Sequence, residues 1–139
     1  AARRALQSLH SGDLAGAVKT APDAIQRMRM PFEVLEQKSG NCIELTFLFA
    51  SAVEAMNMEC AIVLVPGHAY LAVRTDLVNA QYYFIETTLI GQSDLKYAVD
   101  YGYDSWEEDG AAMETDDENY GWVTIGDARD WGVLPVPWR

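Results

Sequence analysis

Residues 41–88 read NCIELTFLFASAVEAMNMECAIVLVPGHAYLAVRTDLVNAQYYFIETT, a long apolar segment followed by three shorter ones. Asn41 and Glu44 have the spacing of a capping box, which predicts that a helix begins here and continues to about Asn57. The body of this helix is apolar on nearly every face. We therefore expect it to lie buried in the middle of a domain.

Three strands are expected after this helix. The first is the β-branched run CAIVLV at residues 60–65, which ends at the turn residues Pro66 and Gly67. The second and third are HAYLAVR at residues 68–74 and QYYFIETT at residues 81–88. The sequence thus predicts an α+β fold in which a central helix packs on a small antiparallel sheet.

Additional helices are expected before residue 41. Within residues 1–30 the pattern favours one helix from Ala1 to Leu9 and a second that begins near Thr20. A shorter helix is predicted from Pro31 to Lys38, with proline at its first position. Gly40 would supply the left-handed residue that ends it.

The region after residue 88 is expected to be more open. A short helix is predicted from Ser93 to Tyr101, closed by Gly102. Residues 97–128 contain ten acidic residues and no Lys or Arg, which is typical of a solvated and mobile surface loop. Residues 120–125 could form a returning strand, and residues 131–138 an extended tail that lays its aromatic side chains on the body of the domain.

The whole chain has 139 residues, the usual size of one domain. We expect a single domain with N-terminal helices over residues 1–30, a core over residues 31–90, and a C-terminal extension over residues 91–139 that carries the acidic loop. The chain starts at Ala1 without an initiator Met. This start is typical of a piece of a larger chain.

Charge and hydropathy exclude two classes of function. Ten Lys and Arg against 21 Asp and Glu give a net charge of −11, and such a field repels a phosphate backbone. Unbroken apolar runs reach only about five residues, far below the roughly 18 of a membrane-spanning helix. We expect no nucleic-acid partner and no membrane span, and the oligomeric state and the compartment stay open.

Cys42 is the predicted nucleophile. It lies in the first turn of the long helix, where unpaired backbone N–H groups and the positive end of the helix dipole favour a thiolate. Cys60 opens a strand inside an apolar run, so we interpret it as a small buried hydrophobe.

A nucleophilic cysteine needs an imidazole as its base. The chain offers His10, in the N-terminal helical segment, and His68, at the start of the second strand. A hairpin centred near Leu77 and Val78 would pair positions whose numbers add to about 155. This register brings Glu86 within one residue of the position opposite His68, where a carboxylate could orient the ring.

The stretch from Pro31 to Arg74 resembles the transglutaminase-like superfamily of cysteine enzymes. In that family G-x-C opens a central helix, G-H-A begins a strand, and an acid follows on the next strand; here these are GNC at 40–42, GHA at 67–69 and IET at 85–87. DAR at 127–129 followed by GVLP at 132–135 resembles an ending of some bacterial members. The resemblance implies a papain-related α+β fold.

The resemblance also implies a triad of Cys42, His68 and Glu86, with Glu86 where transglutaminases more usually have Asp. Such a triad acts on amide bonds of a protein or peptide through a thioester acyl-enzyme, as a peptidase or amidase or by transamidation. Gln37 is the first candidate for a second oxyanion donor beside the Cys42 N–H, and Gln26 the next. The alternative is a catalytically silent binding or scaffolding module that retains the fold.

We expect no cofactor and no metal. Cys42, Cys60, His10 and His68 lie on different elements without zinc spacing. Residues 116–118 (DDE) lack the glycine and the terminal glutamate of a calcium-binding loop.

Overall fold

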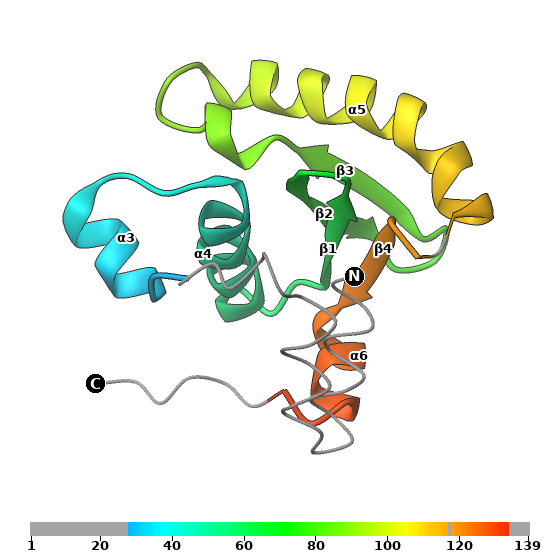
Figure 1. The fold of residues 1–139 in the computed structure, drawn as a ribbon, viewed down its shortest axis with the longest axis horizontal. Helices are drawn as coiled ribbons and strands as arrows, with labels where there is room; N and C mark the ends of the chain where they lie inside the picture. The colour runs from blue at the N-terminus through cyan, green and yellow to red at the C-terminus, as the bar shows by residue number, and fades with distance from the viewer. Residues whose placement is uncertain (1–27, 117, 134–139) are drawn as a thin grey trace.

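The computed structural model of the protein describes residues 28–116 and 118–133. The N-terminal helices predicted within residues 1–30 therefore lie outside the described residues, apart from the irregular residues 28–30. The elements are, in chain order, α3 (Pro31–Gln37), α4 (Cys42–Ala55), β1 (Cys60–Val65), β2 (His68–Asp76), β3 (Gln81–Ile85), the 3-10 turn η1 (Thr87–Leu89), α5 (Leu95–Thr115), β4 (Gly121–Thr124) and α6 (Ile125–Asp130) (Figure 1).

The four strands form one antiparallel sheet in the order β3-β2-β1-β4. The predicted α+β class, with a helix packed on a small antiparallel sheet, is confirmed. In the hairpin of β2 and β3, Leu71 lies opposite Ile85, one residue away from the predicted register. The register shifts between Arg74 and Asp76, which adds an extra residue near the turn.

The sheet lies between two helices. On one face α4 packs on the strands, and on the other face α5 does (Figure 1). The core against α4 consists of Ala50, Val53, Cys60, Leu71 and Val73. The core against α5 consists of Ala61, Val63, Tyr70, Ala72 and Phe84, with Trp106 and Met113 of the helix packed against it. Alternate residues of each strand thus pack against different helices.

Two aromatic side chains of the edge strands meet over the α5 face of the sheet. Although β3 and β4 are its two edge strands, the ring centroids of Tyr82 and Trp122 lie 4.9 Å apart. Both rings pack against the cluster that contains the fully buried Ala61 and Ala72, whose small side chains leave room for them. An open cavity of about 430 Å³, lined by Ala80, Tyr82, Phe84, Trp106 and Trp122, lies here.

Residues 97–115 of the region expected to be an acidic loop instead belong to the long helix α5, so that prediction is wrong for them. Ala98, Gly102, Trp106 and Met113 follow each other at helical spacing and face the sheet. Two of these four side chains are very small, which hides the stripe in the sequence. Gly102 does not end a helix either, because it lies inside α5 where the helix touches β3.

Three smaller predictions also need correction. Lys38, with φ of 51°, is the left-handed residue after α3, whereas Gly40 packs closely against Leu45 and Val34. The third strand ends at Ile85, because the chain turns into η1 at Glu86. The strand at residues 120–125 is present as β4, and the helix α6 after it was not predicted.

Candidate active site

Cys42 is the first residue of α4 and its side chain is half-buried. Asn41 caps the helix: its side chain accepts from the Glu44 N–H at 3.0 Å, and the Glu44 carboxylate accepts from the Asn41 N–H at 3.0 Å. The predicted helix start is therefore confirmed. Cys60 is buried, and burial followed by the nearby Glu54 raises the pKa of its thiol to about 11. It is a core residue rather than a nucleophile.

His68 and Glu86 form a direct pair. Nε2 of the ring lies 2.5 Å from Oε2 of the carboxylate. The other oxygen, Oε1, accepts from the backbone N–H of Thr88 at 3.1 Å and from its hydroxyl at 2.6 Å. Only 3% of the Glu86 side chain is exposed, against 35% of His68. A buried carboxylate held by three donors thus fixes a ring that solvent can reach.

The helix α5 supports this pair from the other side. The backbone N–H of Glu86 donates to the carbonyl of Ala98 at 3.0 Å. The ring of Tyr70 stacks near His68, with centroids 6.2 Å apart, and its hydroxyl donates to Asp109 at 3.1 Å. Burial, together with Asp109, raises the pKa of Tyr70 well above its ordinary value. Tyr70 therefore stays neutral and donates.

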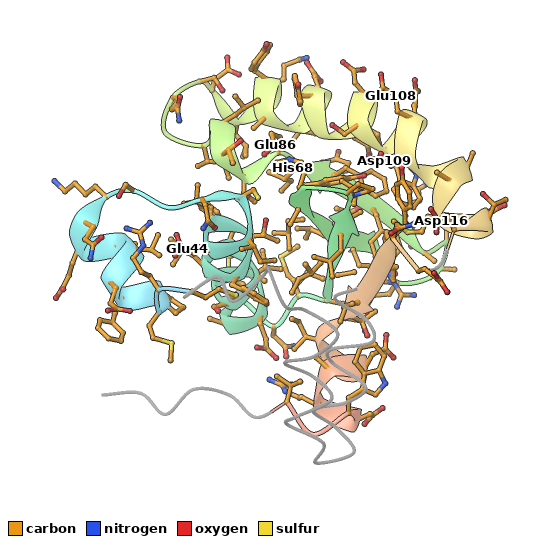
Figure 2. The ribbon with its side chains drawn as sticks, viewed as in Figure 1. Glu44, His68, Glu86, Glu108, Asp109 and Asp116 are labelled. Atoms are coloured by element: carbon orange, nitrogen blue, oxygen red, sulfur yellow. The ribbon has the colours of Figure 1, made fainter. Side chains whose placement is uncertain are left out.

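The start of α4 is tied to the same place by Thr46. Its hydroxyl lies 2.7 Å from the carbonyl oxygen of Cys42, 3.3 Å from that of Ala69 and 3.1 Å from the hydroxyl of Thr87. Ala69 follows His68 in β2, and Thr87 follows Glu86. One buried hydroxyl thus joins the three elements that carry the predicted triad, and Figure 2 shows His68 and Glu86 together below α5.

Sequence reasoning treated Glu44 only as a capping residue, but it is also the centre of an ion pair. Its carboxylate accepts from the Arg29 backbone at 2.9 Å, from Nε at 3.1 Å and from Nη2 at 2.7 Å. Glu44 is 3% exposed. The Arg29 hydrogen bonds, with that of Asn41, lower the pKa of Glu44 to about 2. The pair neutralises a buried charge two residues from Cys42.

Glu44→Gln is expected to lower the free energy of unfolding by about 2 to 3 kcal/mol, because it leaves the Arg29 guanidinium without its charged partner. The carboxyl has a pKa of 4.5 when unpaired and about 2 in the folded protein. Its contribution to stability is therefore complete above pH 4.5 and is lost as the pH falls toward 2. Urea unfolding between pH 2 and 7 should show that this acid-dependent loss is missing from the variant.

Glu59→Gln is the matched control, since Glu59 pairs with Arg74 at 2.6 Å but is 63% exposed. Removing the charge of Glu59 should lower the free energy of unfolding by less than about 1 kcal/mol. Equal effects of the two substitutions would contradict the assignment of a buried ion pair to Glu44.

Of the two predicted oxyanion donors, the structure describes one. Gln37 is exposed on the last turn of α3, and its amide oxygen accepts from Nη1 of Arg29 at 2.5 Å. Gln26 lies outside the described residues, as does His10. The oxyanion role of either glutamine stays a prediction.

Two kinds of site are absent from the described part of the chain. No cluster of three or more His, Cys, Asp or Glu among these residues could hold a metal ion. None of the helices in this part is long and apolar enough to cross a membrane.

Comparisons with protein-family models, with curated proteins and with solved structures gave no match to this chain.

Proposed function

We propose that this chain is a transglutaminase-like domain that acts on amide bonds of a protein or peptide through Cys42, His68 and Glu86. The observation that carries the proposal is the 2.5 Å contact of His68 Nε2 with the buried carboxylate of Glu86. A structural histidine rarely needs a carboxylate held by two further donors, whereas a catalytic base needs its ring fixed in one orientation.

The geometry supports a separate role for each of the three residues. Because Nε2 contacts Glu86, Nδ1 is the nitrogen that remains for the thiol of Cys42. His68 takes the proton of Sγ, and the thiolate attacks the amide carbon. The C–N bond breaks as His68 returns that proton to the leaving amine, and a thioester is left on Cys42.

Water or a second amine then attacks the thioester. The C–S bond breaks, and the proton of the attacking group returns through His68 to Sγ. Water gives a peptidase or amidase, and an amine gives a transglutaminase. The backbone N–H of Cys42 has no acceptor within its own helix, so it is available to the oxyanion.

The test is the rate of Cys42 alkylation by iodoacetamide in the Cys60→Ala variant, in which Cys42 is the single thiol. At pH 6 the folded protein should react about tenfold faster than the same chain unfolded in urea, because the first turn and His68 stabilise the thiolate. Cys42→Ala in the same background should not react at all.

The competing function is a silent binding or scaffolding module. That module needs no activated thiol, so an alkylation rate no higher in the folded than in the unfolded chain would reject the enzyme and favour the module. A normal melting curve for both cysteine variants is the control for folding.

A further inference from the structure

Thr46 is a polar residue with no exposed surface, located one turn into the mostly apolar helix α4. Its hydroxyl oxygen contacts three groups on three elements: the Cys42 carbonyl in α4, the Ala69 carbonyl in β2 and the Thr87 hydroxyl in η1. Apart from the intrahelical contact with Cys42, these contacts span 23 and 41 residues of sequence.

One arrangement of the protons uses both hydroxyls and satisfies the nearer carbonyl. Carbonyl oxygens only accept, and that of Cys42 is the nearer at 2.7 Å, so in this arrangement it takes the Thr46 proton. The Thr87 hydroxyl, also fully buried, then donates to the Thr46 oxygen at 3.1 Å. The chain of donors runs from η1 through Thr46 to Cys42.

A hydroxyl that bonds the carbonyl four residues earlier is common in helices and by itself indicates little. Ser51 in the same helix makes this bond, to Phe47 at 2.8 Å, and is exposed. Thr46 differs because its hydroxyl also reaches the residue after His68 and the residue after Glu86.

We propose that Thr46 is the positioning residue that holds Cys42 at its working distance from the His68–Glu86 pair. This inference rests on the proposed function, because it concerns the same site. Thr46 itself does not touch substrate. It acts through its contacts with the carbonyls of Cys42 and Ala69 and with the hydroxyl of Thr87, so that α4, β2 and η1 cannot shift independently.

The test compares Thr46→Val, which keeps the shape but removes the hydroxyl, with Thr46→Ser, which keeps the hydroxyl. Both are made in the Cys60→Ala background. Thr46→Val is expected to lower the Cys42 alkylation rate at pH 6 by roughly ten- to a hundredfold, because displacements of about 1 Å have effects of this order. Thr46→Ser should stay within about twofold of the parent.

A second readout separates positioning from damage to the triad itself. The ring N–H proton of His68, shared with Glu86, gives a downfield NMR signal, and it should persist in Thr46→Val because that pair is held by Thr88. If Thr46→Val loses both this signal and the fast alkylation, the His68–Glu86 pair has come apart. That result overturns the inference, because Thr46 would then do more than set the distance of Cys42 from the pair.

Two controls come from the same helix. Ser51→Ala removes the exposed hydrogen bond of the Ser51 hydroxyl and should leave the Cys42 alkylation rate unchanged. Val53→Ala removes buried methyl groups far from the site and should lower the melting temperature while the alkylation rate holds. If Val53→Ala slows alkylation as much as Thr46→Val does, the effect is one of general stability and the inference is wrong.

The outcomes distinguish this inference from the proposed function. A parent protein whose Cys42 is no more reactive than in the unfolded chain rejects the proposed function. A reactive parent with an equally reactive Thr46→Val rejects only the role of Thr46. If Thr46→Val does not fold, Thr87→Val removes the other hydroxyl of the cluster and should slow alkylation in the same direction; an unchanged rate there overturns the inference.

Discussion

Gly102→Ala is expected to lower the free energy of unfolding by about 3 kcal/mol or more. A Cβ at this position would lie 2.3 Å from the carbonyl oxygen of Phe84 and 2.7 Å from the backbone nitrogen of Ile85. These are backbone atoms of β3, so no side-chain rotation relieves the clash, and α5 has to move off the sheet. The same movement pulls Ala98 away from the N–H of Glu86.

Thermal and urea unfolding measure this effect, and Gly110→Ala in the same helix is the control. There the nearest atoms belong to the ring of Trp106, at 3.3 Å, and alanine gains about 1 kcal/mol of helix propensity over glycine. Gly110→Ala should therefore be neutral or slightly stabilising. A Gly102→Ala protein as stable as the parent would mean that α5 does not approach β3 this closely.

His68→Ala is expected to reduce kcat/KM for amide turnover by about 10³-fold or more, since it removes the base and the acid of the proposed reaction. Glu86→Gln should reduce it by roughly 10²- to 10⁴-fold, because an amide can still accept from the ring but does not stabilise its charged form. The assay follows ammonia released from a glutaminyl peptide, and hydroxamate formed when hydroxylamine is the acceptor.

Two comparisons make this prediction specific. Glu59→Gln alters an exposed carboxylate far from the pair and should leave turnover unchanged. Activity that survives His68→Ala at the parental level would contradict the assignment of His68 as the base. Ammonia leaves in the first step of both reactions, so hydroxamate equal to ammonia in the parent indicates transamidation, and ammonia in excess of hydroxamate indicates hydrolysis.

The parts of this fold that sequence could predict are those with local signals. Asn41 and Glu44 are three residues apart and form the capping box that their spacing indicates. The three strands β1, β2 and β3 are predicted by short apolar runs that lie between turn residues. The hairpin register, predicted to within one residue, ends at Leu71 and Ile85 and so brings His68 and Glu86 to the same end of the sheet.

What sequence missed depends on contacts between distant segments. Arg29 is fifteen residues from Glu44, and nothing local says that the chain brings them together. Thr46 looks like any hydroxyl in a helix until β2 and η1 are in place. A glycine such as Gly102 is typical of a helix end. Here, however, the absence of a side chain lets α5 pack closely against β3.

The short strand β4 has a consequence for the integrity of the chain. It is the partner of β1 on the side away from β2, and β1 is the wholly apolar run CAIVLV. A polypeptide that stopped before residue 121 would leave that run with an unpaired row of backbone donors and acceptors. Such an edge recruits other chains by cross-strand addition, so a truncation there should give aggregates rather than a smaller soluble protein.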